Sequence, residues 1–230
     1  MTTLHGVVLE VADKTAAERF LAEAFGLAEQ VRVRESGAAT SGFRGFTLSL
    51  TVGQPSTVTS LFESAIAAGA TVIKPVTKSF WGYGGTLQAP DGTIWKIATS
   101  EKKDTGPATR AIDSVVLLLG CADVAVSKKF YVEHGLTVAK SFGRKYVEFD
   151  TTGPLKLALY GRKALAKDAG VPADGTGSHR LALTADAGNF TDPDGFTWEP
   201  APAPSGVSPS DGGLAPENFV AKPTSSGVNP

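Results

Sequence analysis

The sequence has almost no cysteine and no excess of either charge. Cys121 is the single cysteine among 230 residues, which excludes a disulfide within the chain and any metal site built from several thiolates. The 22 basic residues are balanced by 23 acidic ones, giving a formal net charge of −1. A chain so balanced lacks the positive field that attracts nucleic acid or an anionic membrane. We therefore expect neither as a partner.

Long apolar runs are also missing. No stretch approaches the roughly 20 apolar residues that span a bilayer, and the opening MTTLHGVVLEVADK lacks the basic segment and apolar run of a secretory signal. We therefore predict a cytoplasmic protein. Hydrophobic residues make up 42% of the chain and charged residues 20%, as in ordinary soluble globular proteins. The length suffices for one large domain or two small ones.

Three amphipathic helices are predicted from apolar residues that recur at helical spacing. An aspartate or a proline precedes each helix and a glycine follows it, which are common start and stop signals. The helices extend from Asp13 to Gly26, from Pro55 to Gly69 and from Asp123 to Gly135. The segment GRKALAKDAG at 161–170 predicts a shorter, charged helix, either a surface cover or a lid over a sheet edge.

Short apolar or alternating segments between the helices predict strands. They lie at 27–33, 46–52, 71–74, 83–89, 93–98, 112–119, 136–141, 145–150, 155–160 and 180–185. Helices that are apolar along one stripe need a sheet to cover, which predicts an α+β fold. Seven of the 14 prolines fall from Pro200 onward, so we expect residues 201–230 to form an extended or disordered tail.

The chain repeats itself, which divides it into 1–104 and 105–200. The matching pairs are VVLEVADKTAAERF (7–20) with VVLLLGCADVAVSKKF (115–130), FTLSLTV (46–52) with HRLALTA (179–185), and PDGTIWK (90–96) with PDGFTWE (193–199). The last pair ends in opposite charges, Lys96 and Glu199. Either this position has a chemical role or it is a solvated strand end.

These segments together resemble the vicinal-oxygen-chelate superfamily of glyoxalase, bleomycin-resistance and dioxygenase-like proteins. The resemblance rests on the strand, Asp cap and helix at the start of both copies. It rests also on AAGATVIKP…SFWGYGGTLQAPDGTIWKIA within 67–98, and it covers roughly residues 4–199. It implies repeated βαβββ modules that form curled mixed sheets with helices on the outer face. The resulting cup would hold either a divalent metal with its substrate or a small molecule alone.

The two copies are incomplete in different places. Complete βαβββ modules are predicted within 46–98 and 112–160, which leaves a βαβ piece at 4–34 and two strands within 180–199. An unfinished module leaves an unpaired sheet edge and bare apolar surface. We therefore predict that the last strands return to complete the first piece, so that Glu199 shares a sheet with the strand near residue 4.

The resemblance also implies where metal ligands would lie. In metal-using members, the residue four after the PDG glycine is a carboxylate ligand; here that position is Lys96 in one copy and Glu199 in the other. The remaining family positions fall on Gly6, Thr47, Ser114 or Val116, Ala158 and Arg180. His5, Asp113 and His179 are each displaced by one residue, onto the opposite face. A lone carboxylate is a poor divalent-metal site, so we predict no metal and no cofactor.

Two functions of different class follow. The first is metal-independent capture or detoxification of an apolar or aromatic compound, with Phe80, Trp81, Tyr83, Lys96 and Glu199 as ligand-binding residues. The aromatic residues stand among glycines, a pattern that predicts either a pocket wall or a hydrophobic plug over the sheet end. The alternative is a metal-dependent lyase, isomerase or dioxygenase, which requires the strand register to slip by one residue. A homodimer is left open.

Overall fold

The computed structural model of the chain describes residues 2–27, 31–151, 155–186 and 188–201. The predicted tail from residue 202 onward lies outside this range. The described helices are α1 (Lys14–Ala24), α2 (Pro55–Ala67), α3 (Val124–Glu133) and α4 (Arg162–Ala169). The carboxylates of Asp13 and Asp123 accept hydrogen bonds from the first-turn amides of α1 and α3, which confirms both predicted caps. No helix in the described ranges is long and apolar enough to cross a membrane.

The larger sheet is built from the middle of the chain. Its strands are β4 (Phe46–Thr51), β5 (Thr71–Ser79), β6 (Gly82–Gln88), β7 (Ile94–Thr99), β8 (Ser114–Cys121), β9 (Thr137–Phe142), β10 (Tyr146–Asp150) and β11 (Leu155–Gly161). They lie in the order β5-β6-β7-β4-β8-β11-β10-β9. Antiparallel pairing of β4 with β8 joins the two halves. With α2 and α3, these strands form the two complete modules predicted for 46–98 and 112–160.

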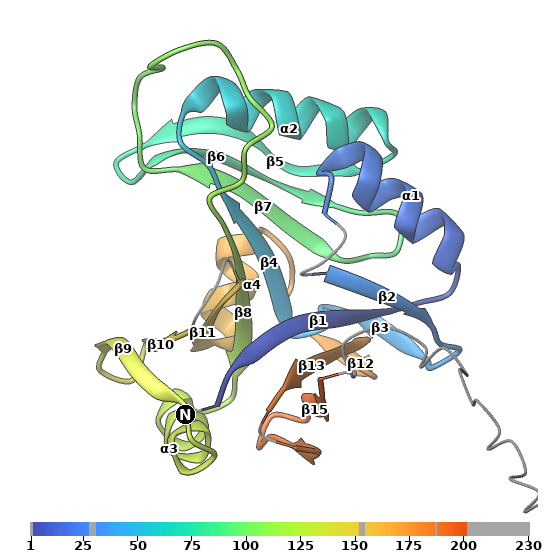
Figure 1. The fold of residues 1–230 in the computed structure, drawn as a ribbon, viewed down its shortest axis with the longest axis vertical. Helices are drawn as coiled ribbons and strands as arrows, with labels where there is room; N and C mark the ends of the chain where they lie inside the picture. Colours follow the sequence, from blue (N-terminus) through green and yellow to red (C-terminus); the bar gives the residue numbers. More distant parts are fainter. Residues whose placement is uncertain (1, 28–30, 152–154, 187, 202–230) are drawn as a thin grey trace, which may run out of the picture.

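The smaller sheet is built from both ends of the chain. Its strands are β1 (Leu4–Val11), β2 (Val31–Glu35), β13 (Leu181–Ala185), β14 (Phe190–Thr191) and β15 (Thr197–Pro200), in the order β14-β15-β13-β1-β2. β1 pairs antiparallel with β13, with Val7 opposite Leu183. Figure 1 shows the blue β1 beside the orange β13 and β15. The prediction that the last strands complete the first piece is confirmed.

Two short strands, β3 (Thr40–Gly42) and β12 (Gly175–Gly177), pair antiparallel and were not predicted. Each has only three residues, and Gly42 and Gly177 adopt positive φ, so neither presents an apolar alternation. β5 extends five residues beyond its predicted end at residue 74. Its side chains are mostly exposed, as expected of an edge strand whose pairing does not depend on burying one face.

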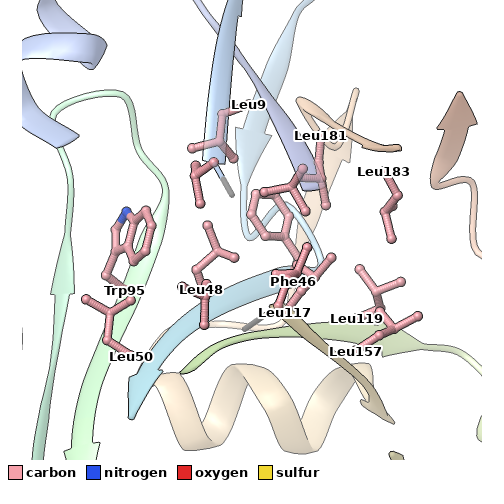
Figure 2. Close-up of a cluster of buried hydrophobic side chains, with 14 of the residues drawn as sticks. Leu9, Phe46, Leu48, Leu50, Trp95, Leu117, Leu119, Leu157, Leu181 and Leu183 are labelled. Atoms are coloured by element: carbon pink, nitrogen blue, oxygen red, sulfur yellow. The ribbon is translucent and has the colours of Figure 1, made fainter. Parts of the chain in front are cut away.

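One hydrophobic core joins the two sheets. Leucines of β4 and β8 meet leucines of β1 and β13 (Figure 2), and all belong to a single buried cluster that also includes residues of α1, α2 and α3. We call the side of each sheet that faces this cluster its core face and the opposite side its cup face. In Figure 2, α4 lies beyond β4 and β8, on the cup face of the larger sheet. The α+β fold with its mixed sheets is as predicted. Helices α1–α3 pack on the core face of the sheets, opposite the cup, which corresponds to the predicted outer face.

Candidate functional site

The cup face of the eight-stranded sheet carries the positions at which the resemblance places metal ligands in the two middle modules. Ser49 of β4 lies between Lys96 of β7 and Val116 of β8 in the strand register. Thr47 of β4 is opposite Leu118, whose neighbour on β11 is Ala158. Lysine, hydroxyl and apolar side chains thus occupy these two rows. The row of Ala158 continues to Glu148, whose carboxylate accepts a hydrogen bond from the Tyr146 hydroxyl at 3.1 Å.

Helix α4 covers part of this face. Leu165, Ala166 and Ala169 are buried and pack in one cluster with Ile94 and Leu118. The segment 161–170 is therefore helical as predicted, and its apolar side fills space that the resemblance assigns to a ligand.

Two lysines of the sheet also hold the C-terminal half of α4. Lys96 Nζ forms an ion pair with the Asp168 carboxylate at 2.9 Å. Lys74 Nζ donates to the carbonyl oxygens of Lys167 and Asp168, at 3.1 and 2.6 Å. A cation at the C-terminal end of a helix is the favourable arrangement for the helix dipole.

A groove of about 510 Å³ remains beside α4. Trp81 at the β5–β6 turn and Lys96 of β7 both border it, together with Thr86 and Asp168. The Trp81 side chain is 83% exposed, so its ring is free to contact a bound molecule. The structure therefore brings together Trp81 and Lys96 of the five predicted ligand-binding residues.

Phe80 and Tyr83 lie differently. The Phe80 ring is 80% exposed at the turn and packs edge-on against Trp81, 5.1 Å between ring centroids, without bordering the groove. Tyr83 borders the groove, but its hydroxyl lies 3.2 Å from Thr59 Oγ1 of α2 and its ring packs against the core cluster. The Tyr83 ring therefore points to the core face, because residues of β6 alternate between faces.

Glu199 belongs to the other sheet. Arg34 of β2 donates to both Glu199 oxygens, at 2.7 and 2.8 Å, and to Glu10 of β1 at 2.6 Å. The hydrogen bonds to Glu199 and Glu10 raise the pKa of Arg34 above its ordinary value. Glu199 and Lys96 therefore lie on different sheets, as predicted from the incomplete copies, and Glu199 does not border the groove beside α4. The charged residue on the last strand of each copy instead forms its own ion pair, Lys96 with Asp168 and Glu199 with Arg34.

The histidines and acids that a slipped register would gather are dispersed. His5 Nε2 lies 2.5 Å from the exposed Asp186 carboxylate. His179 contacts the backbone carbonyl oxygens of Arg44 and Asp194 through its two ring nitrogens. Residues 2–27, 31–151, 155–186 and 188–201 contain no group of three or more His, Cys, Asp or Glu side chains placed to hold a metal ion.

Sequence reasoning missed two of the charged partners. Asp168 reaches Lys96 across 72 positions, and Arg34 reaches Glu199 across 165. Neither residue belongs to a repeated segment, so the repeat gave no indication of them. The available signal was Arg34 at the end of an apolar segment, since an arginine that becomes partly buried is usually paired with an acid.

Comparison with known proteins identifies the fold. No protein-family model matches the chain, and no curated protein matches it. Among solved structures, it is similar to glyoxalase I from Zea mays, at 14% identity and a TM-score of 0.55 over 86% of this chain and 91% of that one. It is also similar to a putative dioxygenase from Bacillus subtilis, at 11% identity and a TM-score of 0.50 over 79% of this chain and 69% of that one. The chain therefore has the fold of these glyoxalase-type structures, as the resemblance predicts.

Proposed function

We propose that this protein binds an apolar or aromatic small molecule in the groove beside α4, without a metal, and so captures or detoxifies it. The observation that carries the proposal is that Trp81 and Lys96 border the same groove. An aromatic wall with a few polar groups is the usual lining of a small-molecule site. The groove volume of about 510 Å³ is within the range of about 300–1,000 Å³ typical of such sites.

Each wall has a distinct chemical role in this proposal. The exposed Trp81 ring offers a face on which an aromatic ligand stacks. Lys96 offers a cation that is held by Asp168 in a pair of which both side chains are more than one-third exposed. Such a pair contributes only about 0–1 kcal/mol, so an anionic or polar group of a ligand could replace Asp168 at modest cost. Thr86, opposite Lys96 on β6, adds a hydroxyl.

The metal-free part of the proposal rests on the residues that occupy the family's ligand positions. Zinc and iron need several nitrogen, oxygen or sulfur ligands that converge from different strands. The larger sheet presents Lys96, Thr47, Val116 and Ala158 there. In the smaller sheet, Glu10 and Glu199 are both bound by Arg34, which would have to leave before either carboxylate could bind a cation.

The binding test uses 8-anilinonaphthalene-1-sulfonate, an aromatic anion whose fluorescence rises on leaving water. We expect it to bind the groove, and we expect Trp81→Ala and Lys96→Met each to weaken binding several-fold. Phe142→Ala is the matched control, because Phe142 is an exposed aromatic residue of β9, 57% exposed, outside the groove. Equal affinity in wild type, Trp81→Ala and Phe142→Ala would contradict the proposal.

The metal test is separate. Elemental analysis of protein purified without chelator should find far less than one equivalent of zinc, iron, nickel or manganese. About one equivalent of any of these, removed in parallel with activity or stability, would favour the metal-dependent lyase, isomerase or dioxygenase instead.

A further inference from the structure

A second cavity lies on the core side of the molecule, where α1 meets both sheets. It measures about 220 Å³ and is bordered by α1, by β1 and β2, and by the Trp95 end of β7. Ala12 and Asp13 at its border are exposed, whereas Trp95 is fully buried. The cavity therefore opens beside the start of α1 and ends at the indole. We call it the α1 cavity; it shares no residue with the groove beside α4.

Three residues that border this cavity each carry a buried N–H donor without an acceptor among the described residues. The donors are the indole Nε1 of Trp95, Nη1 of Arg44 and Nε of Arg180. Nearly all buried polar groups in native proteins have a hydrogen-bond partner, so three orphans around one cavity call for an explanation. All three are donors. The partner they lack is an acceptor.

The charges at the cavity favour an anion as that acceptor. Burial lowers the pKa of Arg44, and the nearby Arg180 guanidinium lowers it further. The closest acid is Asp91, whose Oδ2 lies 3.7 Å from Arg44 Nη1, beyond hydrogen-bond distance. Both Asp91 oxygens are engaged by the amide and hydroxyl of Thr93. The Arg44 guanidinium thus faces a second guanidinium and one nearby carboxylate that is already hydrogen-bonded elsewhere.

Arg180 is held at the cavity in a strained conformation. Its φ of 57° makes it the single non-glycine residue with positive φ in the described ranges. Such a conformation is costly for a bulky side chain and persists where the surroundings enforce it, often at functional sites. Here the Arg180 carbonyl oxygen accepts from the Glu10 amide, and its Nη1 donates to the Ser36 carbonyl oxygen at 2.9 Å. These contacts leave Nε buried without an acceptor.

We propose that the α1 cavity binds a small monocarboxylate with a hydrocarbon body. The carboxylate would accept from Arg44, Arg180 and the Trp95 indole, since arginine is well suited to carboxylate recognition. The hydrocarbon body would lie against the apolar wall formed by Leu9, Ala17, Phe20, Leu21 and Val33. Asp91 and Asp13, which also border the cavity, disfavour a dianion such as phosphate. The volume limits the body to a short chain or one ring.

The three tryptophans provide the readout. In a ¹H–¹⁵N correlation spectrum the indole N–H of Trp95 would gain an acceptor on binding. The indole of Trp198 already donates to the Tyr131 hydroxyl at 3.3 Å, and Trp81 is exposed, so both serve as internal references. Trp95→Phe assigns the signal. We expect propionate or benzoate to shift the Trp95 signal in a saturable way, and benzyl alcohol and inorganic phosphate to leave it unchanged.

Arg180→Gly separates binding from folding. Glycine adopts positive φ without strain, so this variant should keep or raise the thermal midpoint while its affinity for the carboxylate falls about tenfold or more. Trp81→Ala should leave the Trp95 response intact, because the proposal does not rest on the groove beside α4. Failure of both carboxylates to move the Trp95 signal, an equal response to benzyl alcohol, or wild-type affinity in Arg180→Gly would each overturn it and leave a water-filled cavity.

Discussion

The eight-stranded and five-stranded sheets use the same parts but obtain them from different places in the chain. The larger sheet takes its two modules from consecutive segments, 46–98 and 112–160. The smaller sheet takes β1 and β2 from the beginning and β13–β15 from the end, so that Thr184 Oγ1 donates to the Gly6 carbonyl oxygen across 178 positions. The unit of this fold is therefore a pair of modules in space. Segments far apart in sequence can supply it.

The cup faces of the two sheets differ in the charge at one repeated position and in the residue that neutralises it. The terminal charge of the repeated PDG segment is positive in one sheet and negative in the other, and each charge meets an opposite partner from an unrepeated segment. Lys96 pairs with Asp168 of α4, and Glu199 pairs with Arg34 of β2. The reversal of charge between the copies is therefore tolerated because the partner is also exchanged.

The largest expected effect tests whether the two sheets unfold together. Leu183 of β13 and Leu117 of β8 are both fully buried in the shared core, and Figure 2 shows them on the two sheets. Leu183→Ala and Leu117→Ala should each lower the free energy of unfolding by about 2–5 kcal/mol. Because one core joins the sheets, urea denaturation followed by circular dichroism and by tryptophan fluorescence should give one coincident transition for both variants.

A matched surface variant serves as the control for that experiment. Val126→Ala, at a position 54% exposed on α3, should change stability by less than about 0.5 kcal/mol. A separate early transition in Leu183→Ala alone would mean that the five-stranded sheet unfolds as an independent unit and that the shared core does not couple the two sheets.

The fold was predictable because the repeat specifies which pieces are missing. The helix caps at Asp13 and Asp123 and the strand alternation are signals that short segments carry by themselves. The two copies of the repeat lack different strands, so the C-terminal strands were the available partners for the N-terminal piece. The candidate site was less predictable. Trp81 at the β5–β6 turn and Lys96 of β7 border one groove, but the Tyr83 ring turns to the core face through strand alternation. The place of Glu199 in the smaller sheet was predicted, whereas its partner Arg34 was not.

The next largest expected effect is the loss of stability when the ion pair on the cup face of either sheet is removed. Arg34 binds Glu10 and Glu199 through its planar guanidinium, whereas Lys96 holds Asp168 through one ammonium. Arg34→Met should lower the free energy of unfolding by about 1–2 kcal/mol, since it also leaves two carboxylates facing each other, and Lys96→Met by less than about 1 kcal/mol. Thermal denaturation at low salt measures both losses.

Salt provides the check on that interpretation. Raising the ionic strength should reduce the difference between wild type and Arg34→Met, because screening weakens both the attraction to Arg34 and the repulsion between the carboxylates. A difference that does not change with salt, or equal losses in the two variants at low salt, would show that packing of the side-chain stems rather than charge distinguishes the two faces.

The smallest expected effect concerns Asp192, a position at which the two copies of the repeat differ. Ala89, before the PDG of the first copy, is buried, and its counterpart Asp192 is buried as well. The Asp192 carboxylate accepts hydrogen bonds from the amides of Asp194 and Phe196 and from the Tyr131 hydroxyl. This charged group therefore organises the loop before β15, where the larger sheet uses a methyl group.

Asp192→Asn should change how stability depends on pH. Burial, the largest contribution, raises the pKa of the Asp192 carboxyl above its ordinary 3.8. Between that value and the raised pKa the folded state binds more protons than the unfolded state, so the contribution of Asp192 to stability falls as pH rises and is level above this window. The difference in free energy of unfolding between wild type and Asp192→Asn should therefore decrease from about pH 3 upward and then stay constant.

Asp123→Asn is the control of opposite sign, because the Ala125 amide and Arg144 lower the pKa of Asp123; its difference from wild type should increase with pH. Urea titrations at each pH measure both, and two parallel curves would refute the assignment of a buried charge to Asp192.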